Sequence, residues 1–198
     1  HFPFGQLVVL HYQMFGGQSK DIFKAAAAVE LMILSLDIFD DLQDRDNFSV
    51  PWQRMDNALV LNIAIGLLTV SIKALEQTSF DRARKATAID CLNTCVLKAI
   101  NGQHIDLMGN IESEEDYIQM VRGKSGSLMV SACLVGTVLA GDKHHDIVRK
   151  YAEHMGIIAQ IKNDINDTCR WDEKDDLINK RKTLLTIYLL NNQRPQYQ

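Results

Sequence analysis

Proline is scarce in this chain, and its scarcity limits the folds that the chain can adopt. Only 3 of the 198 residues are proline, whereas an all-β chain of this length would normally need more residues that turn the backbone. Apolar residues make up 46% of the chain and charged residues 23%, which is typical of a globular protein with a sizeable core. We therefore expect one all-α domain spanning residues 1–198.

Apolar residues recur at helical spacing along most of the sequence and predict where the helices lie. We expect helices at residues 22–44, 52–75, 80–100, 114–121, 127–140, 145–167 and 176–190. The segment 127–140 is apolar nearly all round, so it should lie at the centre of the bundle. The glycines at 123 and 126 should break the chain just before it. In the second helix the expected core stripe is Leu59, Ile63, Leu67 and Val70.

Charge and cysteine usage indicate the compartment and exclude some partners. The chain has 21 basic and 25 acidic residues, a net charge of −4, which argues against nucleic acid as a partner. Four scattered cysteines without a disulfide pattern favour reduced thiols and a cytoplasmic location. The longest apolar stretch, residues 58–70, is too short to cross a bilayer, so we expect no transmembrane segment.

Several carboxylates gather at the end of the first long predicted helix, directly after apolar residues. Asp40 and Asp44 are one helical turn apart, and Asp37, Asp41 and Asp44 form a second stripe beside them. Neighbouring like charges repel one another on a helix, and a bound Mg²⁺, which prefers oxygen ligands, would remove that repulsion. Considered alone, a solvated acidic helix end explains the cluster equally well.

A second acidic turn follows apolar residues more than a hundred positions later. Asp164 and Asp167 share a helix face, with Gln160 one turn before them. If the two acidic turns face each other, they could hold Mg²⁺ against an anionic substrate, while the apolar helix before each turn lines a pocket. Such a site suits a substrate with a diphosphate head and a hydrocarbon tail.

Five segments in the same order resemble motifs of the trans-isoprenyl diphosphate synthase family. They are Asp40–Asp44 (DDxxD), Gly102–Asp106 (GQxxD), Tyr117 with Lys124–Gly126 (Y…KTG), Gln160–Asp167 (the second acidic motif, with Asn163 in place of an Asp) and Arg181–Leu184 (KxTLP). The resemblance covers nearly the whole chain. It implies the isoprenoid synthase fold, a bundle of long helices around a central cavity, and further helices on both sides of this segment.

The resemblance also implies a role for particular residues. Mg²⁺ would be held by the metal ligands Asp40, Asp41, Asp44, Asn163, Asp164 and Asp167. Lys124, together with Arg181 or Lys182, would contact the phosphates of an allylic diphosphate. Gln103, Ser125 and Gln160 would line the substrate site, and Gln160 and Ser125 would lie near the developing allylic cation. The residues at which catalysis is expected are Asp40, Asp41, Asp44, Lys124, Gln160 and Asp164.

Donor length is expected to depend on the residues four and five positions before the first motif. In elongating relatives these positions limit the tail pocket, and here they are Leu36 and Ser35. Because Ser35 is small, a farnesyl tail could pass it, and geranyl remains open as well.

Departures from the family pattern indicate a different acceptor. Elongating members bind isopentenyl diphosphate through a GGKRxRP segment and through a further pair of arginines. We compare the first with residues 16–22, which contain no arginine, and the positions of the pair fall on Ser49 and Val50. Without those guanidinium groups a second diphosphate would be gripped poorly. The chain resembles instead the branch of the family that transfers geranyl or farnesyl to a tryptophan of a pheromone precursor peptide in quorum sensing. The segments that carry this resemblance are Leu10–Tyr12 with Phe15–Gly17, Gly102–His104, Lys124–Leu128 and Gly156–Ile161. Ala159, where elongating members usually have Phe, would leave room for an indole ring.

Two other functions remain open from the sequence. One is a short-chain prenyl diphosphate synthase that condenses an allylic diphosphate with isopentenyl diphosphate. The other is an inactive subunit that regulates a partner synthase, although the retained acidic motifs argue against it. Homodimers are common in the family.

Overall fold

The computed structural model describes residues 2–44, 49–141, 143–168 and 182–192, and every regular element in those ranges is helical. This confirms the all-α prediction. The elements are α1 (Pro3–Met14), α2 (Ile22–Asp44), the 3₁₀ helix η1 (Pro51–Arg54), α3 (Asn57–Glu76), α4 (Arg82–Met108), α5 (Glu114–Val121), the π-helix η2 (Arg122–Gly126), α6 (Ser127–Ala140), α7 (His145–Thr168) and α8 (Leu184–Asn192).

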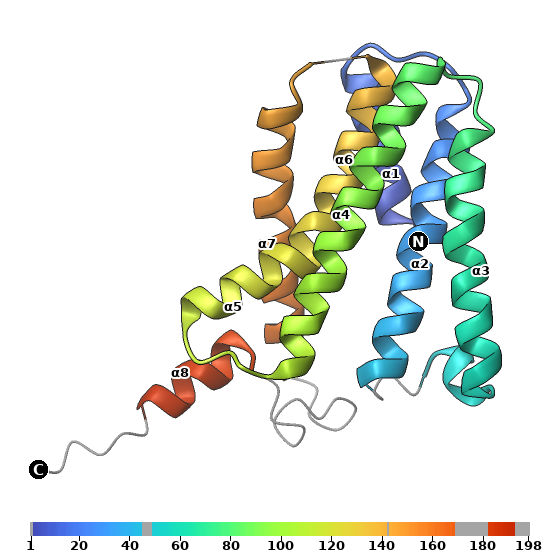
Figure 1. Cartoon of the computed structure of the whole chain (residues 1–198). Helices are drawn as coiled ribbons and strands as arrows, with labels where there is room; N and C mark the ends of the chain where they lie inside the picture. The colour runs from blue at the N-terminus through green and yellow to red at the C-terminus, as the bar shows by residue number, and fades with distance from the viewer. Residues whose placement is uncertain (1, 45–48, 142, 169–181, 193–198) are drawn as a thin grey trace, which may run out of the picture.

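The long helices stand side by side as a bundle, with α5 and α8 at its lower left in the view of Figure 1. Helix α6 is the central one, because its residues from 130 to 139 are all buried. Helices α1, α4 and α7 pack around it. At Gly136 an added Cβ would collide with the backbone of α1, so α1 and α6 cross in direct contact. The predicted central helix is therefore confirmed.

Several predicted boundaries differ from the structure. Helix α1 was not expected, α4 continues to Met108, and α8 begins at Leu184, after Lys182 and Thr183. The start of the predicted last helix, residues 176–181, lies outside the described residues. The expected break at residues 123–126 is instead the π-helix η2, which joins α5 to α6 in one helical run. A wide π turn keeps the backbone helical while its glycines let neighbouring helices approach closely, so glycine there did not end the helix.

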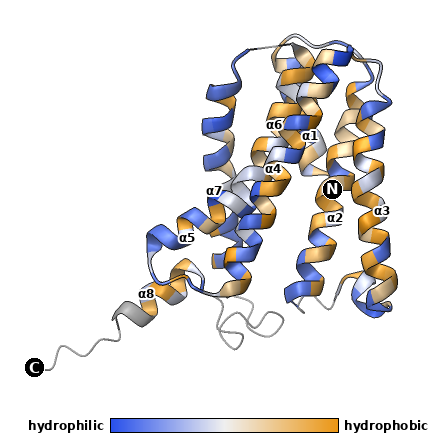
Figure 2. Ribbon diagram, viewed as in Figure 1, coloured by the Kyte–Doolittle hydropathy of each residue, from blue (hydrophilic) through white to orange (hydrophobic). Residues whose placement is uncertain are grey.

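Helix α3 buries a different face from the one predicted. Its buried residues are Val60, Ala64, Ser71 and Leu75, whereas Leu59, Ile63 and Val70 are 59%, 45% and 51% exposed. The small residues face α2, where Ser35 Oγ donates a hydrogen bond to the carbonyl of Ala64 at 2.8 Å. Because α3 is apolar nearly all round (Figure 2), its sequence pattern could not identify the buried face.

Two helical runs in the described residues are long and apolar enough to cross a membrane, by length and composition alone: Asn57–Glu76 and Glu114–Ala140. The prediction that the apolar stretch is too short is therefore wrong, since α3 has 20 residues. The second run is mostly inside the bundle, being 67% buried over its most apolar window, whereas α3 is only 22% buried. Helix α3 therefore presents a long apolar face to the outside of the bundle.

Candidate active site

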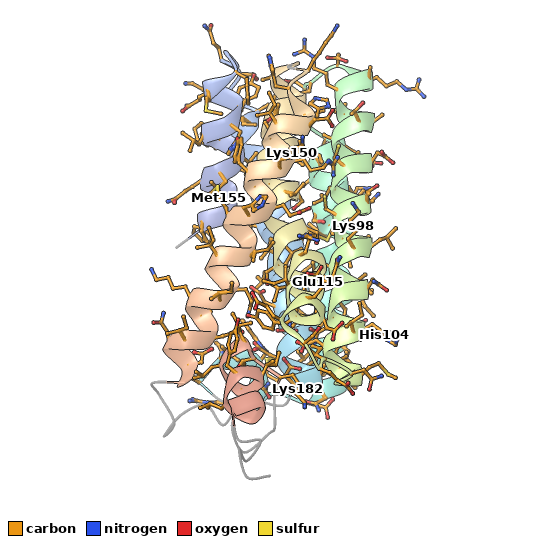
Figure 3. All side chains as sticks on the ribbon, turned by 90° about the vertical axis from the view of Figure 1, so that its left-hand side faces the viewer. Lys98, His104, Glu115, Lys150, Met155 and Lys182 are labelled. Atoms are coloured by element: carbon orange, nitrogen blue, oxygen red, sulfur yellow. The ribbon has the colours of Figure 1, made fainter. Side chains whose placement is uncertain are left out.

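Helices α2, α4 and α7 all end at the same end of the bundle (Figure 1). The last turns of α2 and α7 are the two acidic segments of the sequence, and Asp106 lies in the last turn of α4. The ends of α2, α4 and α7, together with α5 and η2, enclose an acidic cavity of about 210 Å³. It is lined by Asp40, Asp41, Asp44, Asp106, Tyr117, Met120, Lys124, Gln160, Asn163, Asp164, Asp167, Lys182 and Thr183. The structure thus brings all six predicted metal ligands together, along with Lys182, which lies at the lower end of the molecule (Figure 3). Arg181 lies outside the described residues.

Lys124 lies between carboxylates that come from two different helices. Its Nζ is 3.0 Å from Asp40 Oδ1 on α2 and 2.9 Å from Asp106 Oδ2 on α4, and its side chain is 17% exposed. Burial by itself would lower the pKa of Lys124, but the charges of Asp40 and Asp106 outweigh it and raise the pKa above its ordinary value. The cavity therefore contains a permanent cation, which suits a phosphate-binding role.

A hydrogen-bonded chain fixes the second acidic turn. Tyr117 donates its hydroxyl to Asp164 Oδ2 at 2.5 Å, and Gln160 Nε2 donates to Asp164 Oδ1 at 2.8 Å. Ser125 Oγ in turn donates to Gln160 Oε1 at 2.5 Å. Burial and the neighbouring Asp164 carboxylate both raise the pKa of Tyr117, so the phenol stays protonated and remains a donor. Both oxygens of Asp164 are thereby held in place.

Two glycines bring the backbone of η2 against the helices that flank it. A Cβ at Gly102 on α4 would collide with the backbone nitrogen of Lys124, and one at Gly156 on α7 would lie 2.6 Å from the Cα of Gly126. Only glycine allows backbones to approach this closely. The close crossing sets where Lys124 and Ser125 project, and π turns often occur at such functional positions.

A larger, mainly apolar cavity of about 560 Å³ adjoins the acidic one. The two share Asp40, Lys124, Gln160 and Asn163 in their walls. Apolar side chains from six helices line the larger cavity, among them Phe4, Leu36, Leu68, Leu107, Leu128 and Ala159. A molecule could therefore place a charged head beside Lys124 and an apolar tail among these side chains.

The predicted substrate residues divide into two groups. Leu36, Gln103, Lys124, Ser125 and Gln160 line the apolar cavity as expected. Ser35 does not line it: the residue is fully buried between α2 and α3, where its hydroxyl is bonded to α3. Its side chain points toward α3, whereas Leu36 and Asp37, the next two residues of α2, line the cavity. The assignment of Ser35 to the tail pocket is therefore wrong.

The comparison of residues 16–22 with a diphosphate-binding segment is also wrong. These residues lead into the start of α2 at Ile22, whereas Asp44 ends the same helix. A helix of this length separates its two ends by about 33 Å, so residues 16–22 lie at the opposite end of the bundle from the acidic cavity (Figure 1). Ser49 and Val50, by contrast, follow the acidic end of α2.

Several site residues were missed by sequence reasoning. Asp106 and Tyr117 belong to matched motifs but received no role. Asp37 opens onto the apolar cavity, and burial together with the charges of Asp40 and Asp41 raises its pKa to about 7. Trp52 donates its indole N–H to Asp41 Oδ2 at 2.8 Å. The spacing of Asp37 with Asp41 was a visible signal, whereas nothing in the sequence linked Trp52 to Asp41.

The chemistry of the acidic cavity fits a hard divalent cation that a substrate helps to bind. Within the described ranges, no group of three or more His, Cys, Asp or Glu side chains lies close enough to surround one ion. The carboxylates instead lie on opposite walls, with Lys124 between Asp40 and Asp106. Mg²⁺ commonly binds through one or two carboxylates plus substrate phosphates and waters. This arrangement therefore suits metal ions held jointly with a diphosphate.

The helical fold and the two facing acidic turns define an isoprenoid-synthase domain. The chain belongs to the polyprenyl synthetase family, whose family model matches residues 5–198. It is 36% identical over 194 residues to the tryptophan prenyltransferase ComQ of Bacillus spizizenii, covering 96% of this chain and 66% of ComQ. It is 26% identical over 198 residues to a short chain isoprenyl diphosphate synthase of Methanocaldococcus jannaschii, covering 93% of this chain and 60% of that enzyme.

The fold is shared with solved structures of lower sequence identity. A geranyltransferase from Helicobacter pylori, complexed with magnesium and isoprenyl diphosphate, superposes with a TM-score of 0.82 at 19% identity, covering 96% of this chain and 71% of that chain. The present chain spans 51% to 66% of the length of the ComQ proteins that it matches.

Proposed function

We propose that this chain forms the core of a Mg²⁺-dependent prenyltransferase, which transfers a geranyl or farnesyl group to a tryptophan of a pheromone precursor peptide in quorum sensing. The observation that supports it most is the acidic cavity around Lys124 opening onto an apolar cavity, which matches the two ends of a prenyl diphosphate. The tryptophan acceptor is supported by the similarity to ComQ.

In the proposed reaction, the bond between the allylic carbon and the diphosphate oxygen breaks as the indole forms a bond to that carbon, and the indole then loses a proton. Bound Mg²⁺ would neutralise charge on the departing diphosphate. Asp40, Asp41 and Asp44 would hold it on one wall, and Asn163, Asp164 and Asp167 on the other. Lys124 and Lys182 would contact the phosphates, with Arg181 as a further candidate. The apolar cavity would keep water from the allylic cation.

Mass spectrometry of a tryptophan-containing precursor peptide, incubated with the full-length protein, Mg²⁺ and farnesyl or geranyl diphosphate, tests this function. A mass increase of one prenyl group on the peptide is expected. The main alternative, a short-chain synthase, is supported by the similarity to the M. jannaschii enzyme. Longer prenyl diphosphates as the only product, formed with isopentenyl diphosphate, would establish that alternative. Absence of turnover with either acceptor would favour an inactive regulatory subunit.

Ala159 lies in the wall of the apolar cavity and is a candidate for the space that the indole needs. Replacing Ala159 with Phe should lower peptide prenylation at least about tenfold, because the ring would fill that space. Hydrolysis of the prenyl diphosphate donor to the prenyl alcohol should persist in this variant. An Ile158→Phe variant is the control, since Ile158 is 65% exposed. Normal peptide prenylation by Ala159→Phe would contradict the assignment.

The preference for a geranyl or a farnesyl donor should depend on Phe4, since Phe4 lines the apolar cavity and Ser35 does not. Gly5 N–H donates to Glu30 Oε1 at 2.6 Å. This bond places the start of α1 beside Glu30, ten residues or about 15 Å along α2 from Asp40. We therefore place Phe4, which lines the cavity, at the end away from the acidic turns, where it would limit the length of the prenyl tail.

A Phe4→Ala variant should raise the ratio of kcat/KM for farnesyl over geranyl diphosphate by roughly tenfold, since the cavity lengthens. Competition assays with the two donors measure that ratio. Phe2→Ala, which removes an aromatic ring that is 69% exposed, should leave it unchanged. An unchanged ratio in Phe4→Ala would show that the tail ends elsewhere.

We further propose a cytoplasmic homodimer. The three described cysteines are unpaired, which fits a reducing compartment. The outer face of α3 exposes Leu59, Leu61, Ile63, Ile65 and Val70, and contiguous exposed apolar surface of this kind commonly marks an interaction site. Sedimentation equilibrium of the full-length protein tests the oligomeric state.

A further inference from the structure

The segment after α2 folds back so that Trp52 meets the first acidic motif from outside the cavity. Trp52 lies in η1, and its Nε1–H donates to Asp41 Oδ2 at 2.8 Å. Gln53, the next residue, donates its Nε2–H to the backbone carbonyl of Asp41 at 2.9 Å. Two neighbouring side chains therefore bind the same residue, one at its carboxylate and the other at its backbone.

The indole ring of Trp52 is held by apolar packing. It packs against a buried cluster of Ile38, Val60 and Ala64, which joins α2 to α3. A ring anchored in this way keeps its N–H pointing in one direction. The donor that reaches Asp41 is thus part of the α2–α3 interface rather than a mobile surface side chain.

The chemistry of an indole N–H suits a partner that must bind a cation. The group only donates and carries no charge, so it orients a carboxylate without neutralising it. Lys124, by contrast, is a cation paired with the neighbouring Asp40. Carboxylates that bind metals are usually oriented by such outer hydrogen bonds, whose loss typically weakens metal affinity 10- to 100-fold.

We propose that Trp52 is a positioning residue, whose indole N–H fixes the Asp41 carboxylate for binding of a divalent cation at the acidic cavity. The proposal rests on the proposed role of Asp41 as a metal ligand. It predicts that Trp52 acts on cation affinity through Asp41 and has little influence on the reaction once the cation is bound.

The test is a Trp52→Phe variant of the full-length protein, since Phe keeps an aromatic ring in the apolar cluster and removes only the donor. Mg²⁺ affinity is measured by isothermal titration calorimetry in the presence of methylene diphosphonate, a non-hydrolysable diphosphate. We expect affinity about 10- to 100-fold weaker, a raised Mg²⁺ concentration for half-maximal activity, and nearly unchanged kcat at saturating Mg²⁺. Gln53→Ala is the matched control and should change Mg²⁺ affinity less than about threefold, because Gln53 Nε2–H donates to the backbone carbonyl of Asp41 and not to its carboxylate.

A double-mutant cycle guards against a purely structural effect of the substitution. In an Asp41→Asn background, Trp52→Phe should weaken Mg²⁺ binding no further, because residues that act through one group are not additive. Equal Mg²⁺ affinity in wild type and Trp52→Phe, or losses that multiply in the double variant, would overturn the proposal. If the wild-type protein itself bound no Mg²⁺ in the presence of the diphosphonate, both the proposed Mg²⁺-dependent function and the proposed role of Trp52 would be wrong.

Discussion

Replacing Asp40 with Asn should reduce prenyl transfer by about a thousandfold or more. A metal ion that stabilises a departing diphosphate contributes several kcal/mol to the transition state, and each 1.4 kcal/mol corresponds to a tenfold change in rate. Asp40 lines both cavities and pairs with Lys124, so the neutral amide would lose a ligand and also release the ammonium group. Steady-state assays with farnesyl diphosphate and the peptide measure the loss.

Asp90→Asn is the matched control for this experiment. Asp90 is an exposed carboxylate on α4, the helix that carries Asp106, and it lies 16 residues or about 24 Å before that residue. Its replacement should leave activity within about twofold. Excess EDTA should abolish wild-type activity, and added Mg²⁺ should restore it. Activity that survives in Asp40→Asn, or in EDTA, would contradict the metal mechanism.

Replacing Gly102 with Ala should damage both stability and activity, although it adds a single methyl group. The new Cβ would overlap the backbone of Lys124 and lie 2.7 Å from the carbonyl carbon of Gly123. Backbone atoms cannot turn aside as a side chain can, so α4 and η2 must move apart. Overpacking of this kind costs about 1–3 kcal/mol, which for a chain of this size lowers Tm by roughly 2–12 °C. Lys124 would shift with η2, and a displacement near 1 Å can cost about a hundredfold in rate.

Thermal unfolding and kcat at a temperature where the variant is folded separate the two effects. Gly66→Ala is the matched control, because Gly66 lies within α3 with no atom within 4 Å of an added Cβ. That change should raise stability by up to about 1 kcal/mol, since alanine is the better helix former. A Gly102→Ala variant that equals wild type in both measurements would show that the crossing of α4 and η2 adjusts freely.

The local part of the site could be predicted from the sequence. Asp40, Asp41 and Asp44 are neighbours because helical spacing places residues three and four apart on one face, and Gln160 with Asp164 follows the same rule. The length of α2 and the central position of α6 were likewise readable from the distribution of apolar residues. The order of the motifs then indicated the family before any contact was known.

Contacts between distant segments could not be predicted in the same way. The Tyr117–Asp164 and Trp52–Asp41 hydrogen bonds join different elements, and no spacing rule connects such pairs. The buried face of α3 was misassigned because large apolar residues surround that helix, and the small residues that actually face α2 give a weaker signal. The place of Ser35 was wrong because a motif count gives the position along the chain but not the direction in which a side chain points. The place of residues 16–22 was wrong because the count does not show at which end of the bundle a segment lies.

The sequence by itself determined that this chain is helical and that two acidic turns end two of its helices, since both follow from the local periodicity of 3.6 residues per turn. Only the tertiary structure decided that those turns face each other across Lys124, that Leu36 rather than Ser35 lines the tail cavity, and that Trp52 holds Asp41. These outcomes depend on how whole helices pack, and glycine crossings such as Gly102 against η2 set that packing.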